Sequence, residues 1–379
     1  CGATEGMLDA LLATTDPDDE VILTDPTYAG MTNRVRLAGA TPKLVPFVSV
    51  ILNEAKRSEE STRRMDSSSR LESTGTQNDK IQHAASWRLD LDALRSAITT
   101  RTRAMFIMNP SMPSGAVLSQ DEWNEIATLC CKNNLWLIYN AAMERILYDG
   151  VPFIHPVSLP NMRERTITLG SVSKEFRMIG WRIGWVVGPS EIMSDIARVH
   201  IYNVVTPTGI AQSAACAALA SSERDFKNCV DEWQRRRDEV MRQLHGLPFV
   251  PPQGGWSLLM DVGAMGYDSF TASRLLLEKG KIAATPMRDW GEKNSDRFVR
   301  LVFSNEPVER LKELGVPIPE GSAQFRPVDG LGYAQLTLAH DERIEGGKPF
   351  PHSHHQYPPS QEQGEAAGVR GACWNHHGG

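Results

Sequence analysis

The stretch SVSKEFRMIGWRIG, residues 171–184, decides how this chain is interpreted. Lys174 follows Ser171 and Ser173, and Arg182 comes eight residues later. Because lysine is almost never fully buried without a partner, Lys174 is either an ordinary solvated lysine in a turn or a residue with a chemical role. A desolvated lysine beside hydroxyl groups is a candidate Schiff-base nucleophile, and hydroxyls with an arginine can bind a phosphate.

Helix and strand patterns alternate on both sides of this stretch. Helices are predicted over 2–13, before Gly39, over 87–98 and over 119–134, where Ser119 and Glu122 match a capping box. Strands are predicted at 21–23, 42–47, 103–108, 135–140, 165–174 and 182–188. The alternation predicts an α/β fold with a mostly parallel sheet, whose ligands bind beyond the carboxyl ends of the strands. Those ends fall at 109–115, 140–143 and 171–174.

Changes in composition divide the chain into parts. Residues 1–207 are predicted to form a large domain, and a Ser-, Arg- and Glu-rich insert at 50–86 is predicted to be disordered. Long helices and two strands over 208–320 predict a smaller α+β domain. The tail, 321–379, is predicted to be disordered, and its histidines match no closed zinc motif, so no metal site is predicted.

Composition and charge exclude several classes of function. The chain has 379 residues and a net charge of -6, which argues against nucleic-acid binding. It has no apolar run long enough for a membrane span. Its six cysteines show no disulfide spacing, which favours a reducing, cytoplasmic compartment. Because Cys1 already lies inside what reads as a motif, we expect a preceding segment to be missing.

The groups around Lys174 describe a seat for pyridoxal 5'-phosphate. Hydroxyls, an arginine and the backbone amides that open the first helix can hold the phosphate, while Lys174 holds the aldehyde. The predicted phosphate ligands are Gly2, Ala3, Thr4, Ser171, Ser173 and Arg182.

Four motifs resemble the class I/II aminotransferases, the aspartate aminotransferase superfamily of fold-type I pyridoxal-phosphate enzymes. They are GATEGMLDALLATTDPDDEVILTDPTY, MNPSMPSGAVLS, SVSKEFRMIGWRIGW and DRFVRLVFSNEP, which occur in the family's order. The resemblance covers about residues 1–320 apart from the insert. It implies the aspartate aminotransferase fold, with a seven-stranded large domain and a smaller C-terminal domain whose N-terminal part is missing.

The resemblance also assigns roles to single residues. Lys174 would bind the cofactor and carry protons, and Tyr28 would stack on the pyridine ring. Arg300 would bind the α-carboxylate of the substrate. The residues themselves agree for Arg300, because an arginine inside the apolar strand FVRLVF is costly unless it meets an anion. The family's site is shared between two subunits, which implies a homodimer.

Three predicted cofactor-binding positions depart from the family pattern. Asn140 stands where an aspartate usually pairs with the pyridine nitrogen. Met112 and Met143 replace an asparagine and a tyrosine that usually contact the ring's 3-oxygen. Alternatively, Asn140 is only a strand-end cap and the two methionines only fill the core.

The sequence therefore predicts a pyridoxal-phosphate-dependent aminotransferase that moves an amino group from an amino acid to a 2-oxo acid through Lys174. A pyridoxal-phosphate-dependent lyase on the same fold, or a catalytically impaired homologue with a binding role, is the alternative. Trp256, Trp290 and Met287 are predicted to line the substrate pocket, which favours an apolar or aromatic side chain.

Overall fold

The computed structural model describes residues 1–51, 85–292 and 294–315. The predicted C-terminal tail and residues 52–84 of the predicted insert lie outside the described residues. No helix among the described residues is both long and apolar enough to cross a bilayer.

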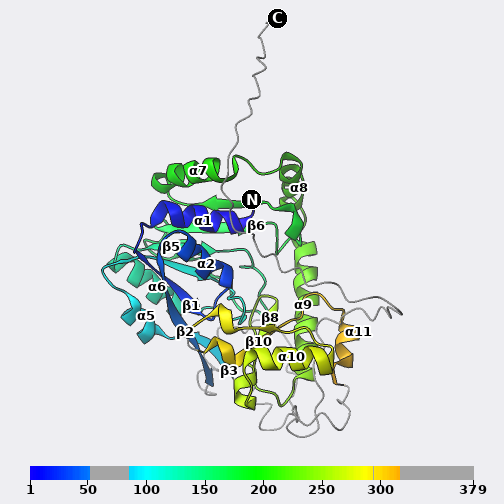
Figure 1. The fold of residues 1–379 in the computed structure, drawn as a ribbon. Coiled ribbons are helices and arrows are strands. Elements are labelled where there is room, and N and C mark those ends of the chain that lie inside the picture. Colours follow the sequence, from blue (N-terminus) through cyan, green and yellow to red (C-terminus); the bar gives the residue numbers. More distant parts are fainter. Residues whose placement is uncertain (52–84, 293, 316–379) are drawn as a thin grey trace, which may run out of the picture. The chain divides into compact units, whose positions relative to one another are not determined.

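A seven-stranded sheet forms the centre of the fold (Figure 1). Its strands are β1 (Glu20–Asp25), β2 (Thr41–Ile51), β3 (Ala85–Leu89), β4 (Thr102–Met108), β5 (Trp136–Asn140), β6 (Thr166–Ser171) and β7 (Gly184–Val187). The order is β3-β2-β1-β4-β5-β6-β7, with β3 and β7 antiparallel at the two edges and the other strands parallel. The predicted mostly parallel α/β sheet is confirmed.

Helices cover both faces of this sheet. They are α1 (Ala3–Thr14) and α2 (Ala29–Leu37) on one face and α5 (Leu91–Ala97) and α6 (Gln120–Lys132) on the other. Helix α7 (Ser190–Val204) packs on α1, and α8 (Gly209–Leu219) and α9 (Glu223–Gln243) follow it in the chain. Neighbouring strand residues belong to separate cores: Leu23 packs with α1 and α2, whereas Ile22 packs with α5 and α6. This alternation buries the strands on both sides, as the near-continuous apolar runs of a parallel sheet require.

A second, three-stranded antiparallel sheet has the order β8-β10-β9 and is flanked by α10 (Ser269–Gly280) and α11 (Val308–Leu311). Its strands are β8 (Ser257–Asp261), β9 (Thr285–Pro286) and β10 (Phe298–Val302). The 3₁₀ helices are η1 (Pro156–Ser158), η2 (Ile179–Trp181), η3 (Val262–Met265), η4 (Arg288–Trp290), η5 (Ser295–Arg297) and η6 (Lys312–Gly315). Phe298 packs edge-on against Trp87 of β3, with 5.9 Å between the ring centres, so the small sheet lies against the large one.

Two local predictions need correction. The segment 87–98 does not begin as a helix, because Trp87 and Leu89 alternate with polar residues and are buried in β3. Helix α5 starts only after Asp90, whose carboxylate accepts a hydrogen bond from the amide of Ala93 at 2.9 Å. The ends of the predicted insert are also ordered strands, since Ile51 pairs with Ala85 in the β2–β3 ladder. The capping box at the start of α6 is confirmed.

Candidate functional site

The parallel strands bring the predicted site segments to one edge of the sheet. Strands β1, β4, β5 and β6 run in the same direction, so the residues that follow them emerge together. This edge carries 109–115, 140–143 and 171–174, as the sequence predicts.

Arg182 joins the Lys174 segment to the start of α1. Its Nη1 donates to Ser173 Oγ at 3.3 Å, and its Nη2 donates to Thr4 Oγ1 at 3.5 Å. Ser171 Oγ in turn accepts a hydrogen bond from the amide of Ser173 at 3.3 Å. The structure therefore brings the predicted phosphate ligands together around one guanidinium group.

Gly2 completes this phosphate seat. It is the N-cap of α1 with φ of 76°, a conformation that favours glycine. A Cβ at this position would stand 2.6 Å from Nη2 of Arg182. No side chain of the part that the structure describes caps α1, so the amides of Ala3 and Thr4 at its first turn point to an anion-binding site.

Lys174 lies between cationic and aromatic groups. Its Nζ stands 4.7 Å above the centre of the Trp256 ring. Burial lowers the pKa of Lys174 below its ordinary value, and the positive charges of Arg300 and Arg182 lower it further. A larger share of this amine is therefore neutral and nucleophilic near pH 7 than for an exposed lysine.

Arg300 reaches the same site from β10. Its guanidinium lies 4.6 Å from the centre of the Trp290 ring, and its Nη2 donates to Thr285 Oγ1 at 3.2 Å. Among the described residues, the buried Nε has no hydrogen-bond partner, and no carboxylate acts on Arg300. A desolvated cation with an unused donor is the arrangement expected of an anion site.

Tyr28 lies beside Arg300. The centre of its ring is 5.8 Å from that of Trp290, the ring against which the Arg300 guanidinium also lies. Tyr28 and Arg300 thus share Trp290 as a neighbour, and the charges of Arg300 and Arg182 both act on Lys174. Stacking of Tyr28 on a pyridine ring stays a prediction.

Asn140 is buried at the end of β5, with 1% of its surface exposed. Its Oδ1 accepts a hydrogen bond from the amide of Ala142 at 3.2 Å, as a strand-end cap does. Among the described residues, its Nδ2 donates to Met31 Sδ alone, a weak acceptor at 3.9 Å. The interpretation of Asn140 as a strand cap therefore accounts for Oδ1, whereas Nδ2 can still donate a hydrogen bond to another group.

Met112 and Met143 pack in the core. Met143 is 1% exposed within the cluster that contains α1 and α2, and Met112 packs against the same cluster. These contacts are apolar, and contact of the two side chains with a cofactor stays a prediction.

Several polar contacts at the site were not predicted from the sequence. They include the Thr285 hydroxyl on Arg300 and the ion pair between Arg145 and Glu175, which are 30 residues apart. Contacts between distant segments leave no local sequence pattern. The one available signal was an arginine shortly after a strand end at the sheet's ligand edge.

Residues 65–314 match the family model of aminotransferase class I and II. The chain belongs to this family. Its members typically use pyridoxal phosphate. The predicted resemblance and the predicted aspartate aminotransferase fold are both confirmed.

Curated relatives and solved structures agree with this assignment. The chain is 31% identical to an aspartate aminotransferase of Pyrococcus abyssi, over 82% of this chain and 72% of the relative. It is 31% identical to a kynurenine–oxoglutarate transaminase of Dictyostelium discoideum, over 82% of this chain and 73% of that one. The crystal structure of an aromatic aminotransferase from Pyrococcus horikoshii superimposes with a TM-score of 0.69 at 30% identity, over 82% and 75% of the two chains.

Proposed function

We propose that this family member is a pyridoxal-phosphate-dependent aminotransferase that uses Lys174 to move an amino group from an amino acid to a 2-oxo acid. The observation that carries the proposal is the position of the Lys174 amine. It lies over the Trp256 ring, where it senses the positive charges of both Arg182, in the phosphate seat, and Arg300. No carboxylate partner of Arg300 occurs within the described residues.

The residues present fit the phosphate group and the aldehyde group of pyridoxal phosphate. Arg182, the serine hydroxyls and the uncapped start of α1 would hold the phosphate, and Lys174 would bond to the aldehyde carbon. At the ring nitrogen, Asn140 would offer a neutral amide. When bound, the cofactor supplies an aldehyde that condenses with amines and a ring that withdraws electrons from the substrate's α-carbon.

Different side chains of this chain would then bind the substrate, move the proton and exclude water. Arg300 binds the α-carboxylate and so orients the substrate's α-hydrogen toward Lys174. The lowered pKa of Lys174 would let its Nζ accept that proton from the α-carbon. With the cofactor bound, the same amine would deliver a proton to the former aldehyde carbon, which completes a 1,3-proton shift. The aromatic faces of Trp256 and Trp290 cover the Lys174 amine and the Arg300 guanidinium and limit the access of water.

The same aromatic faces support apolar or aromatic donors. Trp290 and Tyr28 stand on the Arg300 side of the site. We therefore expect phenylalanine to be a better amino donor than aspartate. A homodimer and a cytoplasmic location also stay predictions.

Borohydride reduction of the protein loaded with pyridoxal phosphate tests the proposal. Peptide mapping should find the pyridoxyl group on Lys174, and a label on another lysine would refute its role. A donor screen with a 2-oxo acid acceptor should then give amino transfer. Ammonia released from a β-substituted amino acid without any acceptor would favour the lyase. Correct labelling without turnover of any donor would favour the impaired homologue.

A further inference from the structure

The turn that carries Lys174 is held by a charged contact from outside. Within the turn, the amide of Arg177 donates to the carbonyl of Lys174 at 3.0 Å. The next residue, Glu175, accepts two hydrogen bonds from Arg145. The Arg145 amide donates to Oε1 at 3.0 Å, and its Nε donates to Oε2 at 2.9 Å. Both oxygens of Glu175 are thus occupied by one partner, which fixes the carboxylate's orientation.

Arg145 also reaches a third segment, the first turn of α9. Its Nη1 donates to both carboxylate oxygens of Glu223, at 2.9 and 3.0 Å. Its guanidinium lies 4.2 Å from the centre of the Phe226 ring. Arg145 therefore ties the segment after β5 and the turn after β6 to α9.

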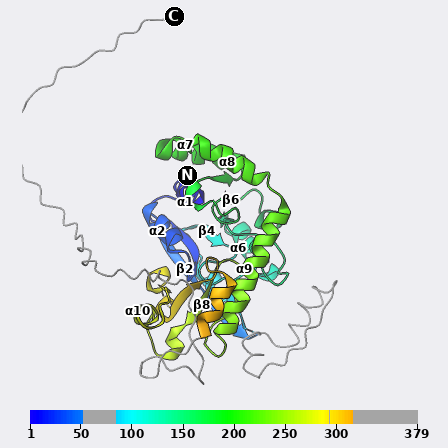
Figure 2. The same ribbon diagram turned by 90° about the vertical axis from the view of Figure 1, so that its right-hand side faces the viewer.

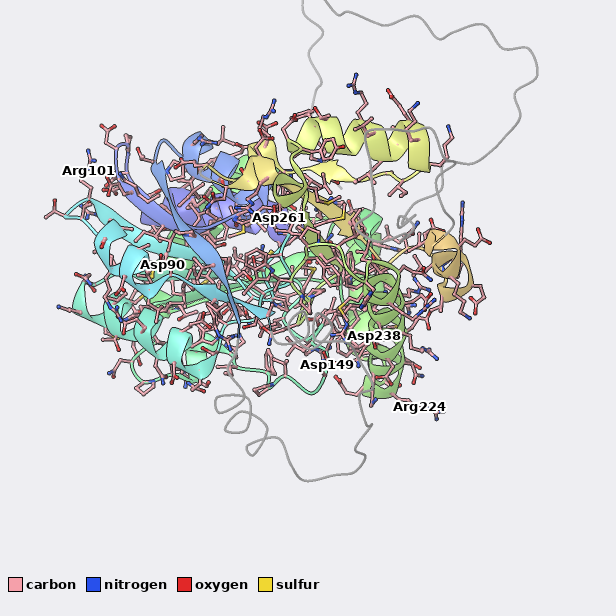
Figure 3. All side chains as sticks on the ribbon, turned by 90° about the horizontal axis from the view of Figure 1, so that it is seen from below. Asp90, Arg101, Asp149, Arg224, Asp238 and Asp261 are labelled. Carbon is pink, nitrogen blue, oxygen red and sulfur yellow. The ribbon has the colours of Figure 1, made fainter. Side chains whose placement is uncertain are left out.

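Helix α9 is itself anchored close to Lys174. Arg237, buried in α9, binds Asp149 with two hydrogen bonds and also pairs with Asp238; Figure 3 labels both aspartates near α9. Trp233 of α9 packs against Trp256, with 5.5 Å between the ring centres, and the Lys174 amine lies over the Trp256 ring. The backbone and the amine of Lys174 are thus both connected to the same helix.

The two halves of the Arg145 contact are not equivalent. The Glu175 side chain is 9% exposed, whereas that of Glu223 is 80% exposed. Water screens the outer pair, so it contributes little. The inner pair is shielded and bidentate, and loss of Arg145 would leave a buried carboxylate without its cation. The inner pair should therefore control the turn.

We propose that Arg145 and Glu175 are positioning residues that hold the Lys174 amine toward the aldehyde of pyridoxal phosphate. The inference rests on the proposed function of Lys174. Neither residue needs to touch the cofactor, because the contact acts through the backbone of the turn. Pyridoxal phosphate bonds covalently to a lysine with loss of water, whereas pyridoxamine phosphate, which lacks the aldehyde, binds only non-covalently.

This difference separates positioning from general structural support. Dissociation constants of both cofactor forms are measured by titration for the wild type and for Arg145→Met, Glu175→Gln and Arg145→Lys. We expect Arg145→Met and Glu175→Gln to weaken pyridoxal phosphate binding by about tenfold and pyridoxamine phosphate binding by less than about twofold. Arg145→Lys should recover part of the loss. The matched control is Arg297→Met, which removes a bidentate pair with Asp261 outside the turn.

The outcomes are distinct. Equal weakening of both cofactor forms, or no weakening of either, overturns the positioning role. Glu175→Gln keeps the test valid if Arg145→Met fails to fold, because it removes the same ion pair with little change in volume. A wild type that binds pyridoxal phosphate without labelling Lys174 refutes the proposed function itself, and the inference with it.

Discussion

Asn140 is the residue at which the sequence and the family disagree most sharply. A carboxylate beside the pyridine nitrogen keeps the ring protonated, and the protonated ring withdraws electrons best. The amide of Asn140 carries no charge, and its oxygen already accepts one hydrogen bond, from the amide of Ala142. A neutral amide stabilises a protonated ring nitrogen less than a carboxylate does, and its Nδ2 is a donor that favours the unprotonated ring.

Asn140→Asp should therefore raise the rate of half-transamination by at least about tenfold, equivalent to about 1.4 kcal/mol of barrier. Cofactor occupancy should change little, because the phosphate contacts supply much of the binding. Stopped-flow spectroscopy with one donor at one pH measures the rate. The exposed Asn124→Asp is the control for added charge. An unchanged rate in an active Asn140→Asp protein would refute the electron-withdrawal argument and leave Asn140 as a strand cap.

Glu144 illustrates a buried carboxyl group that the sequence does not distinguish from a surface one. Burial raises its pKa to about 7, and repulsion from Glu175 adds to the effect. His155 Nε2 lies 3.7 Å from Glu144 Oε2, but burial lowers the pKa of His155. Both groups thus favour their neutral forms, and the contact is not a strong ion pair at neutral pH.

A pH-dependent stability difference follows for Glu144→Gln. The folded protein binds the Glu144 proton more tightly than the unfolded chain, whose carboxyl has an ordinary pKa of about 4.5. Ionising the buried carboxyl therefore destabilises the folded protein. This destabilisation is absent below about pH 4.5, grows as the pH rises toward 7 and is fully present above 7. Between pH 5 and pH 8, the free energy of unfolding of Glu144→Gln should rise relative to that of the wild type by up to about 3 kcal/mol, at about 1.4 kcal/mol per pKa unit. Denaturant unfolding at both pH values measures this. The exposed Glu313→Gln is the matched control. A difference between Glu144→Gln and the wild type that does not change with pH would contradict the burial argument.

Single residues could be predicted where their chemistry conflicts with their surroundings. Lys174 and Arg300 stood out as cations within apolar stretches, and the structure places both near aromatic rings. The Arg145–Glu175 pair could not be predicted, because neither residue is unusual for a segment after a strand. The two residues gain a role only through their contact with each other, and that contact exists only once the sheet has folded.

At the scale of elements, the strands with continuous apolar runs were predictable and the mixed segments were not. Strand β3 and helix α5 share the segment WRLDLDALRSAI, in which Trp87 and Leu89 fit period two and Leu94 fits a helix. Helix α8 has the sequence GIAQSAACAAL, whose small residues show little periodicity. Only Ala211 and Ala215 of α8 are buried, against the apolar residues beside the Lys174 turn.

The contact between α1 and β7 gives an element-scale prediction. A Cβ on Gly184 would lie 2.6 Å from the amide nitrogen of Ala3 and 2.7 Å from the carbonyl oxygen of Gly170. Both are backbone atoms, so Gly184→Ala must push α1 away from the sheet, at a cost of about 1–3 kcal/mol or more. Because α1 carries the phosphate seat, pyridoxal phosphate binding should weaken too. Gly180, four residues earlier, has open space at its Cβ position and provides the control.

Thermal unfolding and cofactor titration of Gly184→Ala and Gly180→Ala check this expectation. Gly184→Ala should show a lower Tm and weaker binding, while Gly180→Ala should resemble the wild type. Equal behaviour of the two variants would mean that the approach of α1 to β7 is not tight enough to control the seat.

At the scale of the whole molecule, apolar side chains gather where α7 leads into α8. This surface, here called the α7–α8 corner, consists of Ile201, Tyr202, Val205 and Ile210, which are 53%, 86%, 72% and 76% exposed. Val205 also has φ of 67°, which is unfavourable for a β-branched residue. Figures 1 and 2 show α7 beside α1, the helix that opens with the phosphate seat. Monomeric proteins rarely expose such a concentration of large apolar side chains, so the corner points to a protein interface.

We expect the α7–α8 corner to contact a second copy of this chain, in line with the predicted homodimer. The double variant Tyr202→Glu with Ile210→Glu should place charges in that interface and convert the dimer to monomers, because a buried unpaired carboxylate is costly. Leu277→Glu on α10 changes an exposed leucine elsewhere and should leave the dimer intact. Sedimentation velocity over a range of protein concentrations measures the assembly state of all three proteins. Since α7 packs along α1, the monomeric variant should also bind pyridoxal phosphate more weakly. A wild type that sediments only as a monomer while binding the cofactor tightly would contradict both the dimer and this link between assembly and the phosphate seat.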